Sequence, residues 1–317
     1  MSRRSTQLVK PKALRKGSKV AVVSPSSPAD PAAISEGIAE LRRLGFVVDE
    51  PAPLPQEGYF AGGHKERLRQ FQKPFRENSI SGVVASRGGY GANYLIDLQL
   101  TTSIAGPKCL VGFSDLNIIQ LLLLETRHWA GFYGPMAAAG FNHGANQPSG
   151  YDEVSFLQAV GETKGGWEIS LRGECIRGGS AAGRIAGGCL TMLQTTLGTG
   201  FEPDTEGAIL VLEDRGMKPY QVDRALRHLY QAGKFKKVSG FLIGDFPDCD
   251  PPAPGSLSIR EICEGILGPL KVPTVYGAPI GHTKRAMLTI PLGVRAKLHA
   301  KGEGMLEILE PAVVDSR

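Results

Sequence analysis

Apolar runs and amphipathic stretches alternate through the first 140 residues, and this alternation restricts the possible folds more than any other feature of the chain. Between the apolar runs, Ile34, Ile38, Leu41 and Leu44 recur at helical spacing. Apolar strands that alternate with helices indicate βαβ units and a parallel sheet covered on both faces. The predicted strands span residues 19–24, 46–48, 80–86, 109–113 and 131–134.

The second half of the chain has shorter, less periodic strands and more turn residues. At 317 residues the chain is about twice the usual domain length of roughly 150, which favours two domains. We therefore predict an α/β fold in which a parallel-sheet domain spans residues 17–145 and a smaller β-rich domain spans 181–317. A polar, turn-rich linker is predicted over 146–180, and β-hairpins over 287–311.

The net charge of +5 is concentrated at the N-terminus. Residues 1–19 hold seven Lys and Arg side chains and no acid, so the rest has 29 basic residues against 31 acidic ones. Residues 1–16 are predicted to be a solvated basic tail. Because the body lacks a basic stripe with interleaved aromatics, no nucleic-acid partner is expected.

The five cysteines are widely spaced, with neither a C-x-x-C pair nor a histidine at zinc-ligand spacing. We expect reduced thiols, no metal and no cofactor. No apolar run approaches the ~18 residues of a membrane span, and the basic N-terminus lacks the apolar core of a signal peptide. The predicted location is therefore the cytoplasm, without membrane association.

Ser114 stands at the end of a predicted buried strand, where a helix begins at once. This is the layout of a nucleophile elbow, in which a tight turn presents the hydroxyl and the next backbone N–H, here that of Asp115, faces a developing oxyanion. The match to G-x-S-x-G is incomplete, because Leu116 occupies the last position. A serine here is also a common helix N-cap, so both roles stay open.

A glycine-rich segment, Arg87-Gly88-Gly89-Tyr90-Gly91, follows the preceding strand. Its glycines allow close approach of the backbone, and their N–H groups are candidates for completing an oxyanion hole. The segment matches neither G-x-G-x-x-G nor G-x-x-x-x-G-K-[ST], which weakens a phosphate-binding interpretation. A plain glycine turn remains the alternative.

A serine nucleophile needs a base and an acid that orients the base. Of the six histidines, His282 lies in a Gly/Pro-rich loop that suits a positioned imidazole. Glu213 ends an apolar strand, where a carboxylate is costly unless it has a partner. Asp245, after the strand at 241–244, is the second candidate for the acid. Either choice places the site in a cleft between the two halves.

Together these segments resemble the LD-carboxypeptidases, the muramoyltetrapeptide carboxypeptidase family of serine peptidases. The similarity runs from about Leu14 over nearly the whole chain. It is carried, in this order, by Val23–Ser27, Arg87–Gly91, Gly112–Asp115, Tyr133–Met136, Leu212–Asp214, Pro219–Arg224, Gly244–Phe246, Gly281-His282 and Pro291–Gly293.

The resemblance implies a flavodoxin-like N-terminal domain, a β-rich C-terminal domain and a homodimer. It implies Ser114 as nucleophile, His282 as base and Glu213 as the orienting acid. The implied oxyanion hole is the N–H of Asp115 with one from the Gly88–Gly89 pair, more specifically Gly89. The implied reaction releases terminal D-Ala from murein tetrapeptides for cell-wall recycling.

A carboxypeptidase must hold a free carboxylate, and Arg87 and Arg215 lie near the predicted site in sequence. One position departs from the family pattern: Cys189 replaces the Asn of Gly-Gly-Asn-Leu, which predicts the loss of any polar contact there. Microcin-immunity hydrolases of the same family are an alternative, but the segment 161–183 offers only Trp167 for stacking a base. A non-enzymatic ligand-binding protein is a third, less favoured hypothesis.

Overall fold

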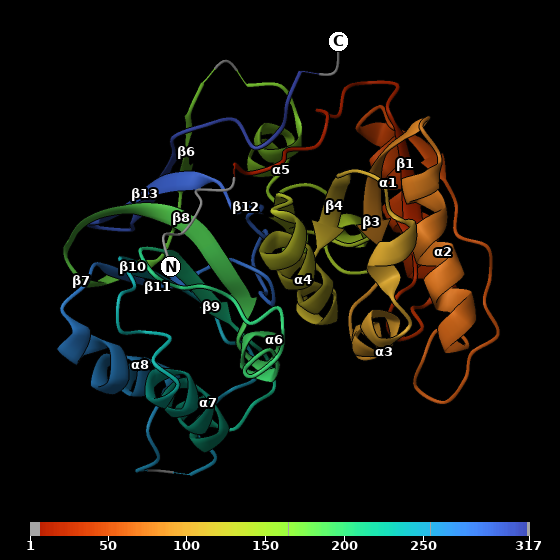
Figure 1. The fold of residues 1–317 in the computed structure, drawn as a ribbon. Coiled ribbons are helices and arrows are strands. Elements are labelled where there is room, and N and C mark those ends of the chain that lie inside the picture. The colour runs from red at the N-terminus through yellow and green to blue at the C-terminus, as the bar shows by residue number, and fades with distance from the viewer. Residues whose placement is uncertain (1–6, 164, 254, 316–317) are drawn as a thin grey trace.

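The first sheet has six strands in the order β12-β5-β4-β3-β1-β2, in which β12 spans Ile290–Leu292. The computed structural model describes residues 7–163, 165–253 and 255–315 (Figure 1). Strands β1 to β5 are parallel in the order 2-1-3-4-5, which is the flavodoxin-like order, and their carboxyl ends lie at one edge. The strands are β1 (Lys19–Val23), β2 (Val47–Asp49), β3 (Ile80–Ala85), β4 (Cys109–Gly112) and β5 (Gly131–Tyr133).

Helices cover this sheet on both faces, as the alternation predicts. In Figure 1, α1 and α2 lie far from the second sheet, whereas α4 lies between the two sheets. The helix α4 contacts β5 of the first sheet and β8 (Gly179–Cys189) of the second, so its buried residues 117–124 have a partner on each side. The helices are α1 (Pro31–Arg43), α2 (His64–Arg76), α3 (Ala92–Asp97) and α4 (Asn117–Arg127).

The second sheet has eight strands in the order β6-β14-β13-β8-β9-β10-β11-β7. Its central strands β8 to β11 are parallel, and antiparallel strands complete both edges. The strands are β6 (Trp167–Ser170), β7 (Glu174–Arg177), β8 (Gly179–Cys189), β9 (Ile209–Glu213), β10 (Gly240–Gly244), β11 (Thr274–Ala278), β13 (Arg295–Ala300) and β14 (Met305–Ile308). Its helices are α6 (Leu190–Thr195), α7 (Pro219–Gln231) and α8 (Ile259–Leu267), of which α7 and α8 pack together. The predicted class, a flavodoxin-like domain with a second, β-rich part, is confirmed.

The chain returns to the first sheet near its end. Strand β12 (Ile290–Leu292) pairs with β5 in antiparallel register, Ile290 opposite Tyr133 and Leu292 opposite Gly131. Part of the segment predicted as hairpins therefore belongs to the first sheet, and only β13 and β14 form a hairpin. Pro291 lacks a backbone donor, which an edge strand such as β12 tolerates.

The expected linker and tail are more ordered than their composition indicates. Residues 146–180 contain α5 (Glu153–Val160), β6 and β7. Trp167 and Ile169 are buried while their neighbours in β6 are exposed, which is the two-residue period of a strand packed on one face.

Residues 7–16, the described part of the basic segment, pack on the body rather than extending into solvent. Leu14 is buried, and bridges pair Val9 with Trp129 and Lys12 with Val314. Residues 1–6 lie outside the described part of the chain. Among the described residues, no helix has the length and apolarity needed to cross a bilayer.

Candidate active site

Ser114 lies at a strained turn between β4 and α4. Gly112 ends β4, Phe113 is extended, and Ser114 adopts a φ of 61°, a left-handed conformation that non-glycine residues seldom take. A short 3-10 turn, Ser114–Leu116, then leads into α4. The N-cap of α4 is Leu116, and no side chain caps that helix end. The serine thus has the backbone of an elbow, and the capping role is not observed.

The glycine-rich segment passes directly over this turn. A Cβ added to Gly88 would lie 2.9 Å from Ser114 Oγ and 3.4 Å from the Asp115 backbone nitrogen, so only glycine fits there. The Gly88 carbonyl accepts a hydrogen bond of 3.2 Å from the Ser27 backbone N–H. The Gly88 C=O and the Gly89 N–H belong to the same trans peptide and point to opposite sides of it. The Gly89 N–H is therefore directed away from Ser27.

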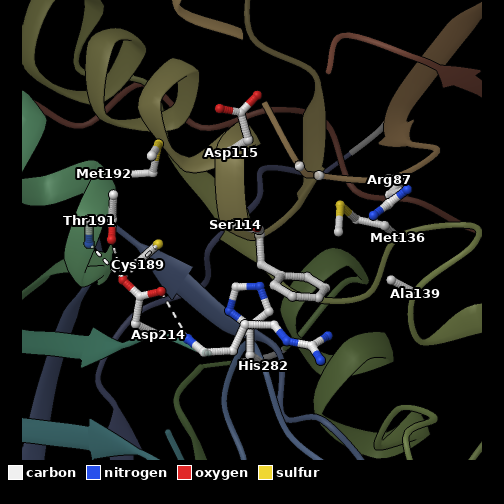
Figure 2. A pocket seen from close by; sticks show the side chains of 14 residues that line it. Arg87, Ser114, Asp115, Met136, Ala139, Cys189, Thr191, Met192, Asp214 and His282 are labelled. Atoms are coloured by element: carbon white, nitrogen blue, oxygen red, sulfur yellow. Dashed lines mark hydrogen bonds between the residues drawn. The ribbon is translucent and has the colours of Figure 1, made fainter. Parts of the chain in front are cut away.

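Asp115 contributes its backbone to the turn, and its side chain serves another purpose. The carboxylate accepts a hydrogen bond of 2.9 Å from the Ala92 N–H at the start of α3, and burial raises the pKa of this carboxyl. Figure 2 shows the carboxylate directed away from Ser114 and His282. Asp115 therefore links the serine turn to the segment that follows the glycines.

His282 and Glu213 form a buried pair. Oε2 of Glu213 accepts hydrogen bonds of 2.9 Å from both Nδ1 and the backbone N–H of His282. Glu213 is fully buried at the end of β9, and Gly281, with φ +62°, leaves no room for a Cβ beside its carboxylate. Burial disfavours the imidazolium, but the Glu213 charge and hydrogen bond outweigh this and raise the pKa of His282.

Tyr133 completes the contacts of Glu213. Its hydroxyl, fully buried at the end of β5, donates a hydrogen bond to Oε1 of Glu213. Burial and the neighbouring Glu213 charge raise the pKa of Tyr133 well above its ordinary value, so the group stays a neutral donor. Two protein partners thus satisfy both oxygens of the buried carboxylate, as its burial demands. The segment Tyr133–Met136 carried part of the family resemblance, but the sequence assigned no role to Tyr133, because its partner Glu213 lies 80 residues away in the chain.

Asp245, the second candidate for the acid, does not contact the imidazole. Its carboxylate accepts hydrogen bonds from Thr283 and from Arg285, the latter at 2.5 Å and 3.2 Å. Both partners follow His282 in sequence, so Asp245 holds the loop that carries the histidine.

Ser114, His282, the glycine pair and both arginines line a cavity of about 520 Å³ between the two sheets, whereas Glu213 contacts His282 from outside the lining. Figure 2 shows Ser114 and His282 at its centre, with Thr191 and Asp214 on one side and Met136 on the other. The phenyl ring of Phe113 packs edge-on against the His282 ring, with centroids 4.9 Å apart. The cavity is lined by Arg87, Gly88, Gly89, Phe113, Ser114, Asp115, Met136, Ala139, Cys189, Thr191, Met192, Asp214, Arg215 and His282.

Cys189 retains a polar contact, contrary to the expectation from the missing asparagine. Its thiol donates to Asp214 over 3.6 Å, and its backbone N–H donates to the Asn117 side chain over 3.1 Å. Burial and the nearby carboxylates raise the pKa of the Cys189 thiol, so it remains protonated. Thr191 also donates twice to Asp214, at 2.9 Å and 2.6 Å, which fixes this buried carboxylate in the cavity wall.

Both predicted arginines line the cavity, and each already has a protein partner. Arg87 donates to the Pro28 carbonyl over 2.9 Å, and Arg215 forms an ion pair of 2.8 Å with Asp248. Both side chains are exposed. Among the described residues, no group of three or more His, Cys, Asp or Glu side chains is arranged to hold a metal ion.

Two family models match the chain. The LD-carboxypeptidase N-terminal domain matches residues 20–134, and the LD-carboxypeptidase C-terminal domain matches residues 182–298. The fold and the two matched domains thus define a peptidase of mixed α/β architecture, with its cavity between two sheets. The chain belongs to the LD-carboxypeptidase family of peptidases.

Similarities to individual proteins support this family assignment. A probable murein peptide carboxypeptidase from Bacillus subtilis is 33% identical over 297 residues, covering 92% of this chain and 91% of the relative. A solved muramoyltetrapeptide carboxypeptidase from Oxalobacter formigenes has a TM-score of 0.79 at 28% identity, covering 92% of this chain and 99% of its own. The microcin C7 self-immunity protein MccF shares the fold, with a TM-score of 0.86 at 22% identity, covering 96% of this chain and 100% of its own.

Proposed function

We propose that this protein is an L,D-carboxypeptidase that removes terminal D-Ala from murein tetrapeptides with a Ser114–His282–Glu213 triad. The observation that carries this proposal is the buried hydrogen bond between His282 and Glu213 at a cavity that also contains the strained Ser114. Murein peptides are the substrates named for the Bacillus subtilis relative, and muramoyl tetrapeptide is named for the Oxalobacter formigenes enzyme.

The contact with Glu213 selects the tautomer of His282. A carboxylate can only accept, so Nδ1 carries the proton and Nε2 is left with a lone pair for the Ser114 hydroxyl. Nε2 takes the hydroxyl proton as Oγ attacks the scissile carbonyl, and Glu213 stabilises the imidazolium that forms. The imidazolium then protonates the leaving D-Ala nitrogen, and a water molecule repeats the sequence to release the acyl group from Ser114.

The oxyanion formed by this attack needs donors on the other side of the serine. We assign this role to the backbone N–H groups of Asp115 and Gly89. The Asp115 nitrogen lies next to Gly88, and the peptide that carries the Gly89 N–H is oriented by its hydrogen bond to Ser27. Such fixed donors stabilise the developing charge without reorganising during the reaction.

For the microcin-immunity alternative, the family resemblance implies an aromatic side chain in the second domain that stacks a base. Trp167 is the aromatic residue available in the segment 161–183, and it is buried in β6 at the edge of the second sheet. Its ring is therefore packed against the protein and is not available to stack a base. The homodimer implied by the family resemblance stays a prediction.

The proposed function is tested by incubating purified protein with murein tetrapeptide and pentapeptide and following free D-Ala. We expect D-Ala release from the tetrapeptide, unchanged after exhaustive dialysis against EDTA, because the proposed chemistry needs no metal. Cleavage of aminoacyl sulfamoyl nucleosides with no action on the tetrapeptide would refute the proposal. Activity that is lost on chelation and restored by zinc would refute the serine mechanism.

Tyr133 should act as a positioning residue for this triad. In Tyr133→Phe, Oε1 of Glu213 loses its donor, so the carboxylate is held less firmly and attracts the imidazolium proton more strongly. We expect turnover to fall roughly 10-fold, in line with the loss of about 1–2 kcal/mol from a hydrogen bond to a buried charge. The acidic limb of the pH–rate profile, already displaced upward by the raised pKa of His282, should move to still higher pH.

Tyr151→Phe provides the matched control for this prediction. Tyr151 is also fully buried and donates to a carboxylate, that of Glu40, but it lies outside the cavity. Removing the Tyr151 hydroxyl should not shift the pH–rate profile. Identical profiles for the two variants would show that Tyr133 has only a packing role.

A further inference from the structure

A second cavity, of about 360 Å³, adjoins the first at His282. The two cavities share the wall residues Arg87, Phe113, Ala139, Arg215 and His282. Only the first contains Ser114 and the glycine pair, whereas only the second contains Asp248, Thr283 and Lys284. The imidazole therefore stands between a chamber with the proposed nucleophile and oxyanion donors and a chamber without them.

Positive charge predominates in the second chamber. Lys284 Nζ lies 2.9 Å from one oxygen of Asp248, and Arg215 lies 2.8 Å from the other. Two cations thus share one carboxylate, and Arg87 adds a third positive charge to the wall. The Arg215 and Lys284 side chains are 60% and 75% exposed, so both remain accessible to a ligand. An excess of positive charge in an open chamber suits an anionic group.

The chemistry of acyl transfer decides which part of the substrate this anionic group belongs to. The imidazolium must deliver its proton to the leaving nitrogen, so the leaving residue lies on the imidazole side of the scissile bond. The oxyanion lies toward the backbone donors of the first chamber. A residue that leaves past His282 enters the second chamber, and its free carboxylate then comes close to the cations there.

We propose that the second chamber is the leaving-group subsite, in which Lys284 and Arg215 bind the carboxylate of the departing residue. This inference rests on the proposed carboxypeptidase function and specifies which part of the peptide lies in which chamber. The acyl part of the peptide occupies the chamber lined by Cys189, Thr191 and Asp214. Lys284, which the sequence reasoning did not single out, is then a specificity-determining residue.

A pair of substrates tests the assignment directly. One is the tetrapeptide with a terminal D-Ala carboxylate, and the other is the same peptide ending in D-alaninamide. In Lys284→Gln and in Arg215→Gln, we expect KM for the carboxylate substrate to rise roughly 10- to 100-fold with little change in kcat, because a contact made equally in ground and transition state is lost. Both variants should hydrolyse the amide substrate as well as the parent does.

Lys301→Gln is the matched control, since Lys301 is an exposed lysine in the turn between β13 and β14, outside both chambers. It should behave as the parent on both substrates. Equal losses on the two substrates, or no loss on either, would overturn the subsite assignment. A parent enzyme inactive on both peptides would instead refute the proposed function, so the two failures are distinguishable.

Discussion

Replacing Ser114 by alanine is expected to lower turnover by about 10⁶, as when the nucleophile of a serine triad is removed. The backbone donors and the cavity remain in Ser114→Ala, so KM should change little. Alanine at position 114 has the same Cβ as serine, so the φ of 61° is no more strained in the variant than in the parent. The measurement is single-turnover release of D-Ala beside labelling by a fluorophosphonate, which reacts with an activated serine hydroxyl.

The matched control deletes a hydroxyl far from the cavity. Ser258 caps α8 through its bond to the Glu261 N–H, so Ser258→Ala should cost about 1 kcal/mol of stability and leave labelling intact. Labelling of Ser114→Ala at the parental rate would show that the nucleophile is another residue.

The second large effect concerns Glu213→Gln, for which we expect a loss in turnover of about 10³–10⁴ by analogy with amide-for-acid exchange in other triads. The amide preserves size but removes the charge that stabilises the imidazolium. If its NH₂ group faces His282, it opposes the proton on Nδ1 and favours the wrong tautomer. If its oxygen faces His282, the NH₂ group faces the Tyr133 hydroxyl, which must turn its proton elsewhere.

Asp245→Asn is the comparison that makes this prediction specific. Asp245 holds Thr283 and Arg285, so its amide variant should loosen the histidine loop and cost far less turnover than Glu213→Gln. Measuring both variants on one tetrapeptide, with Ser114→Ala as the baseline, decides between the two acids. A nearly parental Glu213→Gln beside an inactive Asp245→Asn would mean that Glu213 is misassigned.

Local patterns in the sequence were sufficient to predict much of the fold and site. Strand–helix alternation predicted the parallel sheet, because each βαβ unit is specified by nearby residues. The strand ends at Ser114 and Glu213 were visible as polar residues after apolar runs. The common edge of parallel strands explains why Ser114 lies beside the Arg87–Gly91 segment, since both follow strands of the first sheet. Glu213 ends a strand of the second sheet, so its approach to Ser114 through His282 depends on how the two sheets pack.

Features that depend on distant contacts were not predictable in this way. Nothing local in Ile290–Leu292 distinguishes a hairpin strand from an edge strand of the first sheet. The basic segment looked solvated because its charges dominate its composition, whereas Leu14 packs into the core. Tyr133 and Lys284 likewise acquire their neighbours Glu213 and Asp248 only through the tertiary fold.

The return of the chain through β12 means that the protein cannot be divided into two autonomous modules at residues 146–180. A fragment ending there would leave β5, which is wholly buried in the intact chain, as an open apolar edge prone to aggregation. The complementary fragment would carry β12 without a strand to pair with. The same strand, which follows soon after His282, tethers the histidine loop to the sheet that holds Ser114. Separately produced halves should therefore regain solubility and hydrolysis only when refolded together.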